Sequence, residues 1–357
     1  MSAIIYTESS PLVVAGDIGG TNTTLALVER KGPTEFEVRE KIGFSSQKLP
    51  SIEEGIDKAL KVWSEKLGKL ELRGMCLSGA GPVTNNCCHT SNIPWDIDGN
   101  EISQSIRIPT LVINDFSAIC YGIPLLTQNN SSQLIPLPHP DGTRPSPREF
   151  RAESTVQAVV GAGTGLGIGY LIQDHGHYMA LPSEAGHSDF GGYDDITRDL
   201  QKYLHMRIGM NPGTEQFVSG QGIVNIHEFL CSISPDPGPG NQQILSLPRE
   251  ERAPQISTSA KSDGLCAEAM KLFVGMYARF ASSVALTFLP QAGLYLAGGI
   301  AAKNKEWFLE DARFMKAFLK NYKKSVAGAL KGIPVFIVDD YGISIPGAAL
   351  GFFALNG

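Results

Sequence analysis

Short apolar runs alternate with longer amphipathic stretches along the chain, and this alternation predicts an α/β fold. Apolar runs that end in a glycine or a polar turn predict buried strands; they occupy residues 12–15, 23–28, 74–77, 111–113, 156–160, 168–172, 295–297 and 335–338. Apolar residues at helical spacing predict helices at 51–67, 265–289 and 305–330. The first helix has the clearest ends, because Ser51 and Glu54 fit a capping box and Gly68 follows the last turn.

Two proline-rich segments, 126–155 and 232–264, interrupt this alternation. Their composition predicts surface excursions or a boundary between lobes. Two predicted hairpins, around Asp17 and around Gly163, share one construction: a strand, a small-residue turn that contains Thr, and a second strand. Because the hairpins lie about half a chain apart, they indicate two similar lobes that share a cleft.

The length of 357 residues is enough for two domains or one large one, and it can bury a core without a disulfide or a metal. With 30 Lys and Arg against 36 Asp and Glu, the net charge is −6, and without basic clusters this excludes a general nucleic-acid binder. Charged residues make up only 18%, whereas 39 residues are glycine. These values are typical of a well-buried α/β protein that brings its backbone close to a ligand.

The six cysteines, the N-terminal segment and one uncharged stretch exclude further classes. No Cys-x-x-Cys pair and no zinc spacing occurs, so the vicinal Cys87 and Cys88 are interpreted as buried or idle thiols. The N-terminal segment lacks the basic region of a secretory signal. The uncharged stretch 280–302 contains Pro290, polar residues and glycines, which predicts a buried helix end, a turn and a strand rather than a membrane span. We therefore expect a soluble, cytoplasmic protein that binds neither nucleic acid nor membrane.

The first glycine-rich motif, Gly16-Asp17-Ile18-Gly19-Gly20-Thr21, lies at the turn of the first predicted hairpin. Its adjacent glycines let backbone N–H groups approach an anion, and Thr21 adds a hydroxyl donor. Asp17 can hold a Mg²⁺ ion that neutralises phosphate charge. On its own, the segment is equally compatible with an ordinary hairpin turn.

A second glycine-rich turn strengthens the hypothesis of phosphate binding. Residues 161–167 include four glycines, and the centre of the turn is Gly163-Thr164-Gly165. Neither this turn nor the first is a Walker A loop, because no Gly-Lys-Ser/Thr follows. Neither opens directly into a helix, as a dinucleotide-binding fingerprint does. The two turns therefore argue against both P-loop kinases and nicotinamide enzymes.

A third motif, Leu296-Ala297-Gly298-Gly299-Ile300, runs from a buried strand into paired glycines, against which an adenine or ribose could lie. Together the three motifs resemble the two phosphate motifs and the adenosine motif of the sugar kinase, Hsp70 and actin superfamily. Further segments narrow the resemblance to its bacterial-type hexokinase/glucokinase family: 90–95, 113–116, 181–190 and 215–222. The motifs run in the family's order from residue 16 to about residue 300.

The resemblance implies two ribonuclease-H-like lobes, the actin-like ATPase fold, around a central cleft. It implies a small lobe at 1–125 plus 341–357 and a large lobe at 126–340. ATP with Mg²⁺ would bind at the two hairpins, with adenosine near Gly298 and Gly299, and glucose would be the second substrate. The resemblance also implies a homodimer, which is the usual assembly in the family. The implied activity is phosphorylation of D-glucose at O6, which gives glucose 6-phosphate and ADP.

Polar residues near the predicted strand ends have the chemistry of a sugar kinase site. Asn114 and Asp115 follow a buried strand, and Asp115 is suited to accept the proton of a sugar hydroxyl that attacks a γ-phosphate. Without the other motifs, Asp115 is better explained as a turn or cap aspartate. Glu184, His187 and Glu215 can accept hydrogen bonds from vicinal hydroxyls, and the resemblance implies that they bind the sugar.

Some alternatives stay open. Glu184 and His187 also have the spacing of a metal pair on a helix, although Pro182 and Gly186 interrupt a helix there. An actin- or Hsp70-like ATPase without a sugar substrate would share the phosphate hairpins, and mannose or another hexose could replace glucose. A sugar-responsive repressor is disfavoured, because about a dozen residues precede the first hairpin and no cysteine-rich zinc motif follows His187.

Overall fold

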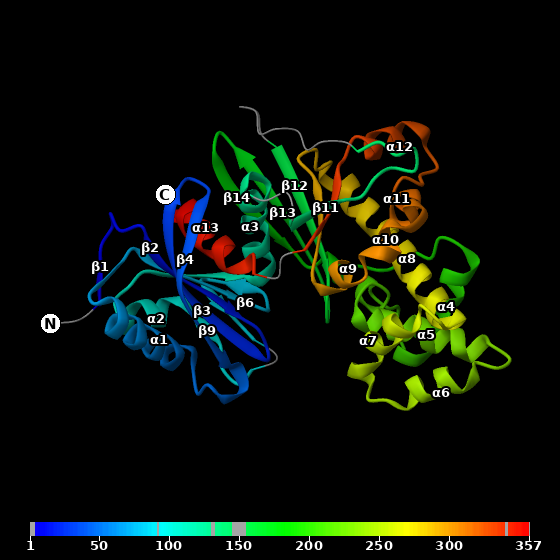
Figure 1. Cartoon of the computed structure of the whole chain (residues 1–357), viewed down its shortest axis with the longest axis horizontal. Coiled ribbons are helices and arrows are strands. Elements are labelled where there is room, and N and C mark those ends of the chain that lie inside the picture. Colours follow the sequence, from blue (N-terminus) through cyan, green and yellow to red (C-terminus); the bar gives the residue numbers. More distant parts are fainter. Residues whose placement is uncertain (1–3, 91–92, 130–132, 145–154, 340–341, 357) are drawn as a thin grey trace. The chain divides into compact units, whose positions relative to one another are not determined.

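The computed structural model describes residues 4–90, 93–129, 133–144, 155–339 and 342–356, and Figure 1 shows the course of the chain. The chain divides into two compact units: unit 1 comprises Met1–Gln133, Gly169–Pro182 and Asp340–Gly357, and unit 2 comprises Leu134–Ile168 and Ser183–Asp339. Residues 169–182 thus fall in unit 1, whereas the predicted boundaries assign them to the large lobe. Those boundaries stay a prediction, and their Tyr341 lies outside the described residues.

A five-stranded sheet with the order β10-β6-β2-β3-β4 forms the centre of unit 1. Its strands are β2 (Leu12–Ile18), β3 (Asn22–Gly32), β4 (Glu35–Ser45), β6 (Gly74–Gly79) and β10 (Thr110–Asn114). β3 is antiparallel to β2 and β4, whereas β6 is parallel to β2 and β10. The predicted hairpin around Asp17 is therefore confirmed, and β2, β6 and β10 have their carboxyl ends at the same edge of the sheet.

Helices cover both faces of this sheet (Figure 1). α1 (Ile52–Leu67) and α2 (Gly99–Ile106) share one core with the sheet, in which Trp63 is 1% exposed. α13 (Ser344–Asn356) packs on α3 (Asp115–Asn129), β2 and β6. Ser51 caps α1 as predicted, but the carboxylate of Glu54 pairs with Lys58, so only half of the capping box forms.

Two small sheets complete unit 1. β1 (Ile4–Tyr6) pairs in parallel with β5 (Leu70–Leu72). β7 (Val83–Thr84), β8 (Cys87–Cys88) and β9 (Ile97–Asp98) form an antiparallel three-stranded sheet. Residues 91 and 92, which belong to the segment 90–95 of the family resemblance, lie outside the described part of the chain.

Unit 2 is built on a six-stranded sheet with the order β11-β16-β15-β12-β13-β14, and the division between the units runs through β13 and β14. The strands are β11 (Leu134–Pro136), β12 (Thr155–Ala162), β13 (Leu166–Asp174), β14 (His177–Ser183), β15 (Leu294–Ala297) and β16 (Val335–Val338). β15 is parallel to both β12 and β16, and β11 is antiparallel to β16. Helix α8 (Gly264–Phe288) is fixed to β12 by Tyr277, whose hydroxyl donates to Val160 O at 2.8 Å.

The prediction of an irregular excursion at 232–264 is wrong, because two helices occupy most of it. α6 (Gly238–Ser246) accommodates Pro239 in its first turn, where a proline has no hydrogen bond to lose. α7 (Arg249–Ser259) continues through Pro254, near its middle. α7 packs on α6 and on α5 (Gly220–Ile233), and His227 Nε2 of α5 lies 2.7 Å from Asn241 Oδ1 of α6. Neither α5 nor α4 (Asp195–Ile208), which packs on α5, was predicted. In the other proline-rich segment, α3 extends to Asn129, and residues 130–132 and 145–154 lie outside the described part.

The single long helix predicted at 305–330 is also wrong. The segment forms α10 (Lys305–Leu309), a short 3₁₀ turn, α11 (Arg313–Phe318) and α12 (Lys324–Lys331). Asp311 and Ala312 each have φ of 52°, a left-handed conformation that ends the helix between α10 and α11. The bend lets a set of aromatic side chains pack together in the core: Tyr277, Phe308, Phe314 and Phe318.

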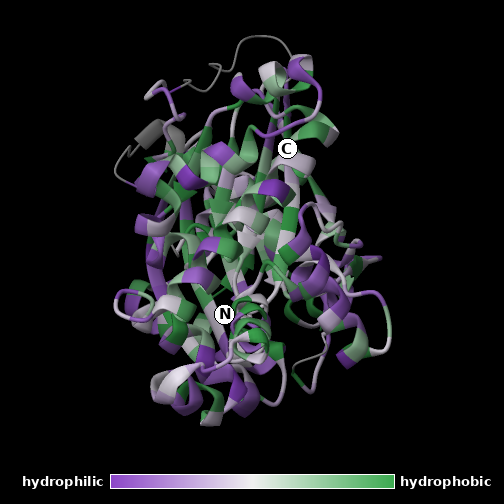
Figure 2. Cartoon of the chain, turned by 90° about the vertical axis from the view of Figure 1, so that its right-hand side faces the viewer, coloured by the Kyte–Doolittle hydropathy of each residue, from purple (hydrophilic) through white to green (hydrophobic). Residues whose placement is uncertain are grey.

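Hydrophobic residues concentrate in the inner elements and hydrophilic residues along the outer loops and helix faces (Figure 2). Among the described helices, none is both long and apolar enough to cross a bilayer. The uncharged stretch 280–302 instead forms the end of α8, a turn and the buried strand β15, as the sequence predicts.

A nearly buried carboxylate holds the helices of unit 2 together. Glu228 on α5 is bound by Arg207 of α4 at 2.5 Å and by Arg249 and Arg252 of α7 at 2.6 Å each. Burial alone would raise the pKa of Glu228, but hydrogen bonds from Arg249 and Arg207 outweigh it and hold the pKa below its ordinary value. The ionised carboxylate therefore stabilises the folded state.

Replacing Glu228 with Gln should lower the free energy of unfolding by about 2 kcal/mol at neutral pH, because three guanidinium groups lose their anion and are themselves partly exposed. A group with a lowered pKa contributes stability above its unfolded pKa and loses it as the pH falls. The difference in free energy of unfolding between wild type and Glu228→Gln should therefore shrink below about pH 4.5, the ordinary pKa of a Glu side chain. Urea unfolding at neutral and acid pH measures it, with the exposed Glu250→Gln on α7 as control. Equal stability of wild type and Glu228→Gln at pH 7 would contradict the expectation.

Candidate active site

The candidate residues of unit 1 lie at one edge of its central sheet. The strand register places Ile18 beside Gly79, and Gly79 beside Asn114. Neighbouring strands are about 4.8 Å apart, so the ends of β2 and β10 are separated by about 10 Å. The sheet therefore brings Asp17 and the Asn114-Asp115 pair to the same edge, although almost a hundred residues separate them in sequence.

Backbone contacts fix Asn114 and Asp115 where β10 turns into α3. The side-chain amide Nδ2 of Asn114 donates to the backbone oxygen of Gly81 at 3.0 Å. The N–H of Phe116 donates to Oδ1 of both Asn114 and Asp115, each at 2.9 Å. Asp115 thus makes the local contact expected of a helix-start aspartate, and the same contact holds its carboxylate in a defined orientation. Such a fixed carboxylate is what a positioned general base requires.

The thiol of Cys88 lies close enough to Asp115 to feel its charge. Burial, and next the negative charge of Asp115, raise the pKa of Cys88 to about 11. This thiol is therefore protonated at neutral pH and carries no negative charge that would compete with Asp115. The sequence interpretation of Cys88 as a buried, unreactive thiol fits this environment.

The first glycine turn is held by the segment that follows β4. Ser46 Oγ donates to Gly19 O at 2.7 Å, and Gln47 Nε2 donates to Gly20 O at 3.0 Å. Because N–H and C=O point in opposite directions across a trans peptide, these contacts turn the following N–H groups to the other side of the loop. That arrangement suits an anion site, with Thr21 exposed beside it.

Two members of the first motif face the core of unit 1 rather than solvent. A Cβ on Gly16 would lie 2.6 Å from the side chain of Leu77, and Ile18 is 1% exposed. Packing therefore explains the small residue at Gly16 and the apolar residue at Ile18, and only their backbone could contact a ligand.

A residue that the sequence did not suggest contacts Asp17. Ser344, at the start of α13, donates from its hydroxyl to Oδ2 of Asp17 at 2.6 Å, and it is nearly buried. The contact spans 327 positions in sequence, so no local pattern could reveal it. It orients the Asp17 carboxylate, the group predicted to hold Mg²⁺.

Replacing Ser344 with Ala should lower kcat/KM about tenfold, because a hydrogen bond to a charged group contributes about 1.5–3 kcal/mol. If Asp17 holds the metal, the Mg²⁺ concentration that gives half-maximal rate should rise as well. Steady-state assays across a Mg²⁺ titration measure both effects. Ser64→Ala is the control, because the half-buried Ser64 hydroxyl donates to Lys61 O within α1. If the Mg²⁺ dependence of Ser344→Ala equals that of the wild type, Ser344 does not contribute to metal binding.

The candidate residues of unit 2 gather around the second glycine turn. The turn closes through Gly163 N to Gly165 O at 2.9 Å, and Gly220 N donates to Gly163 O at 2.8 Å. Gly298 has φ of 85°, and a Cβ there would lie 2.7 Å from Ala162 O. The third motif therefore packs directly against β12, the strand that leads into the second turn. Its two glycines follow β15, and Gly299 is the first residue of α9 (Gly299–Lys303).

Glu215 is tied to the same turn. Its Oε2 accepts the backbone N–H of Leu166 at 2.9 Å, and a Cβ on Gly165 would come within 2.6 Å of that oxygen. Gly165 is therefore required for the carboxylate to approach, and Thr164 lies at the exposed tip between the two glycines. The sequence placed Glu215 with the sugar and the turn with phosphate; the structure adds a direct contact between them.

Glu184 directly precedes a short 3₁₀ turn, Ala185–His187, and His187 ends it. This turn packs beside the Glu215 segment. Thr214 Oγ1 donates to Ser188 O at 2.9 Å, and a Cβ on Gly186 would lie 2.1 Å from Leu166 O. Both side chains are exposed, with His187 Nε2 3.8 Å from Glu184 Oε2. The packing thus gathers Glu184, His187 and Glu215 with the second glycine turn within unit 2.

Known proteins resemble this chain over nearly its whole length. The sequence profile of the family described as Glucokinase matches residues 14–354. Glucokinase from Nostoc sp. (strain PCC 7120) is 33% identical over 95% of this chain and 98% of its own length. A solved glucokinase from an Antarctic psychrotroph is similar with a TM-score of 0.78 at 24% identity, covering 97% of this chain and 99% of that one. A ROK family glucokinase from Streptomyces griseus, in complex with glucose and AMPPNP, has a TM-score of 0.59 at 18% identity over 97% and 100%.

Proposed function

The chain belongs to the glucokinase family, and we propose that it transfers the γ-phosphoryl group of ATP to the 6-hydroxyl of D-glucose, giving glucose 6-phosphate and ADP. The observation that carries this proposal is the family match over nearly the whole chain, residues 14–354. The ROK family glucokinase that shares the fold holds glucose and AMPPNP, which supports a nucleoside triphosphate as donor. The actin-like ATPase without a sugar substrate, the main alternative from sequence, is disfavoured by the same match.

Under this proposal, Asp115 accepts the proton of the 6-hydroxyl as its oxygen attacks the γ-phosphorus. The bond between that phosphorus and the β–γ bridging oxygen breaks, and the bridging oxygen leaves with ADP. Asn114, Glu184, His187 and Glu215 bind the other hydroxyls of the sugar, since amide, carboxylate and imidazole groups form directional hydrogen bonds with a neutral polyol. Support for these roles comes from the fixed orientation of Asp115 and from the clustering of the acceptors in unit 2.

Phosphate binding is assigned to backbone donors and hydroxyls of the two glycine turns, Gly16–Thr21 and Gly163–Gly165, with Gly298 and Gly299 against the adenosine. Mg²⁺ is part of the proposal, and the donor set fits it: Asp17 offers a hard carboxylate, and Mg²⁺ in kinase sites binds one or two carboxylates plus phosphate oxygens. When bound, the ion neutralises charge on the phosphates. Ser344 keeps the Asp17 carboxylate in one orientation for that role.

The substrate assignment is tested by measuring ADP release with Mg²⁺-ATP and glucose, mannose, fructose, N-acetylglucosamine or no sugar. We expect strong stimulation by glucose and little turnover without sugar. Stimulation by mannose alone would keep the mechanism and change the substrate, since one contact to a hydroxyl can reverse such a preference. Equal turnover with and without every sugar would overturn the kinase assignment and favour a nucleotide-switched ATPase.

The family resemblance also implies a homodimer and a cytoplasmic location, and both stay predictions. Analytical ultracentrifugation at assay concentrations tests the first, with twice the chain mass of 38.4 kDa as the expected species. Microscopy of a tagged full-length chain in its own cell tests the second.

A further inference from the structure

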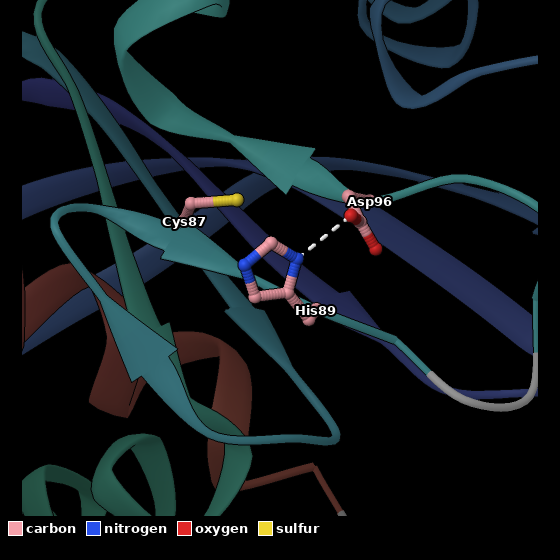
Figure 3. Close-up of side chains that lie close together, drawn as sticks. All are labelled: Cys87, His89 and Asp96. Atoms are coloured by element: carbon pink, nitrogen blue, oxygen red, sulfur yellow. Dashed lines mark hydrogen bonds and ion pairs between the residues drawn. The ribbon is translucent and has the colours of Figure 1, made fainter.

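A group of potential metal ligands lies on the small sheet β7-β8-β9 of unit 1 (Figure 3). Donor atoms of Cys87, His89 and Asp96 all lie within 4.8 Å of one another. Across the described residues, no other three His, Cys, Asp or Glu side chains gather in this way. Sequence spacing gave no sign of it, because Cys-x-His followed by a distant Asp matches none of the usual zinc patterns.

The strand register explains why these residues meet. β8 and β9 pair antiparallel, with Cys87 opposite Asp98 and Cys88 opposite Ile97. His89 directly follows β8 and Asp96 directly precedes β9, and their side chains are in contact, with His89 Nδ1 2.8 Å from Asp96 Oδ2. Side chains alternate between the two faces of a strand, so Cys87 and His89 point to the same face and Asp96 joins them from across the pair. The β8–β9 pairing therefore aims three different donor groups at one region.

The hydrogen bonds prepare the histidine for a metal. His89 Nδ1 is 2.8 Å from Asp96 Oδ2, and Asp96 Oδ1 accepts the N–H of Thr90 at 3.0 Å. With Nδ1 donating to the carboxylate, Nε2 keeps its lone pair, and Figure 3 shows the second ring nitrogen on the side of Cys87. A carboxylate that orients a histidine in this way is the usual support of a metal-bound imidazole. The side chains of His89 and Asp96 are 69% and 47% exposed, so an ion can enter from solvent.

A second pair in the chain shows what the cysteine adds. His175 Nδ1 lies 2.9 Å from Asp174 Oδ1 and is 75% exposed, but no cysteine accompanies it. The His–Asp contact alone is thus an ordinary surface pair. Thiolate and imidazole together select zinc or another divalent transition metal over Mg²⁺ or Ca²⁺.

We propose that Cys87, His89 and Asp96 form a Zn²⁺ site, with the ion bound by Cys87 Sγ and His89 Nε2, Asp96 supporting the imidazole, and water completing the coordination. The ion would join Cys87 to His89, and the His89–Asp96 contact would couple it to the residue before β9, which would stabilise the folded form of this strand pair. The site is separate from the proposed Mg²⁺ at Asp17, and its existence does not depend on the kinase assignment.

Co²⁺ titration of the reduced, full-length protein tests the site, because a cobalt–thiolate bond gives a charge-transfer absorption that oxygen and nitrogen ligands do not. We expect one equivalent of Co²⁺ to produce this band and Zn²⁺ to abolish it by competition. Cys87→Ser should remove the band, His89→Gln should remove or strongly weaken it, and Asp96→Asn should weaken binding about 10- to 100-fold. His175→Gln is the matched control and should bind as wild type does.

Two outcomes would overturn the proposal: no thiolate band in the wild type, or a band that persists in Cys87→Ser. Because His89 is exposed, His89→Gln is expected to fold normally, so its loss of the band cannot be ascribed to unfolding. Thermal unfolding adds a second readout: Zn²⁺ should raise the Tm of wild type and of His175→Gln, but not of Cys87→Ser. An equal rise in all three would place the ion elsewhere and reject the site.

Discussion

Replacing Asp115 with Asn is expected to lower kcat for glucose phosphorylation by about a thousandfold, because a positioned general base contributes roughly 10²–10⁴-fold to a rate. The substitution is conservative for the structure: the side-chain oxygen that accepts the Phe116 N–H at 2.9 Å is retained. What is lost is the negative charge that takes up the proton. The KM for ATP should change little, since the Asp115 carboxylate is assigned to the sugar hydroxyl and not to the nucleotide.

Steady-state kinetics with saturating ATP, together with calorimetric titration of glucose, separates the two roles that Asp115 can have. A base is required for turnover, so kcat should fall while glucose still binds within about tenfold of the wild-type affinity. Asp57→Asn, on the exposed face of α1, is the control for the loss of one negative charge. If Asp115 only caps α3, kcat would stay near that of the wild type and the base would have to be sought elsewhere.

The strands and their glycine turns were predictable because their signals are local. β2, β6, β10, β12, β13, β15 and β16 are apolar runs that end in glycine or polar residues, and the structure confirms each near the expected positions. Both ends of α1 were predictable for the same reason: Ser51 caps its first turn, and Gly68 has φ of 83° after its last. A pattern that lies within one or two turns of backbone can be read without knowing the tertiary structure.

The misplaced helices show the limit of such patterns. The apolar periodicity of 305–330 contains no glycine or proline that would interrupt it before residue 328. The break at Asp311 and Ala312 is imposed by packing, since it lets Phe308, Phe314 and Phe318 enter one core. In 232–264 the error is the reverse. The packing of α7 on α5 and α6, and the contact of His227 on α5 with Asn241 on α6, stabilise helices that their prolines disfavour.

The candidate site residues also divide into those with a local sequence signal and those that only the tertiary structure brings together. Asp17, Asn114 and the glycine turns were visible because each follows an apolar run. Ser344 was not, because its partner Asp17 lies 327 positions away, and neither was the contact of Glu215 with Leu166 across 49 positions. The tertiary fold decides which polar side chains contact each other, so the pattern of a single sequence cannot predict such long-range contacts.

The hydrogen bond between Glu215 and Leu166 predicts a large loss of activity when Glu215 is replaced. Glu215→Ala should lower kcat/KM for glucose by about a hundredfold, because both the sugar hydroxyl and the Leu166 N–H lose an acceptor and a hydrogen bond to a charged group contributes about 1.5–3 kcal/mol. It should also raise the KM for ATP, because Leu166 directly follows the Gly163–Gly165 turn that is proposed to bind phosphate. A change in a sugar-binding residue would then affect the nucleotide.

Glu215→Gln separates the two contributions. The amide oxygen of Gln can still accept the Leu166 N–H, so the turn should stay in place and the KM for ATP should remain close to that of the wild type. The charge is lost, so the KM for glucose should still rise about tenfold. Measuring both KM values for the two variants decides between the possibilities. If Glu215→Ala raises the KM for glucose alone, the contact with Leu166 is structural and does not position the phosphate turn; if neither KM changes in either variant, Glu215 does not bind the sugar.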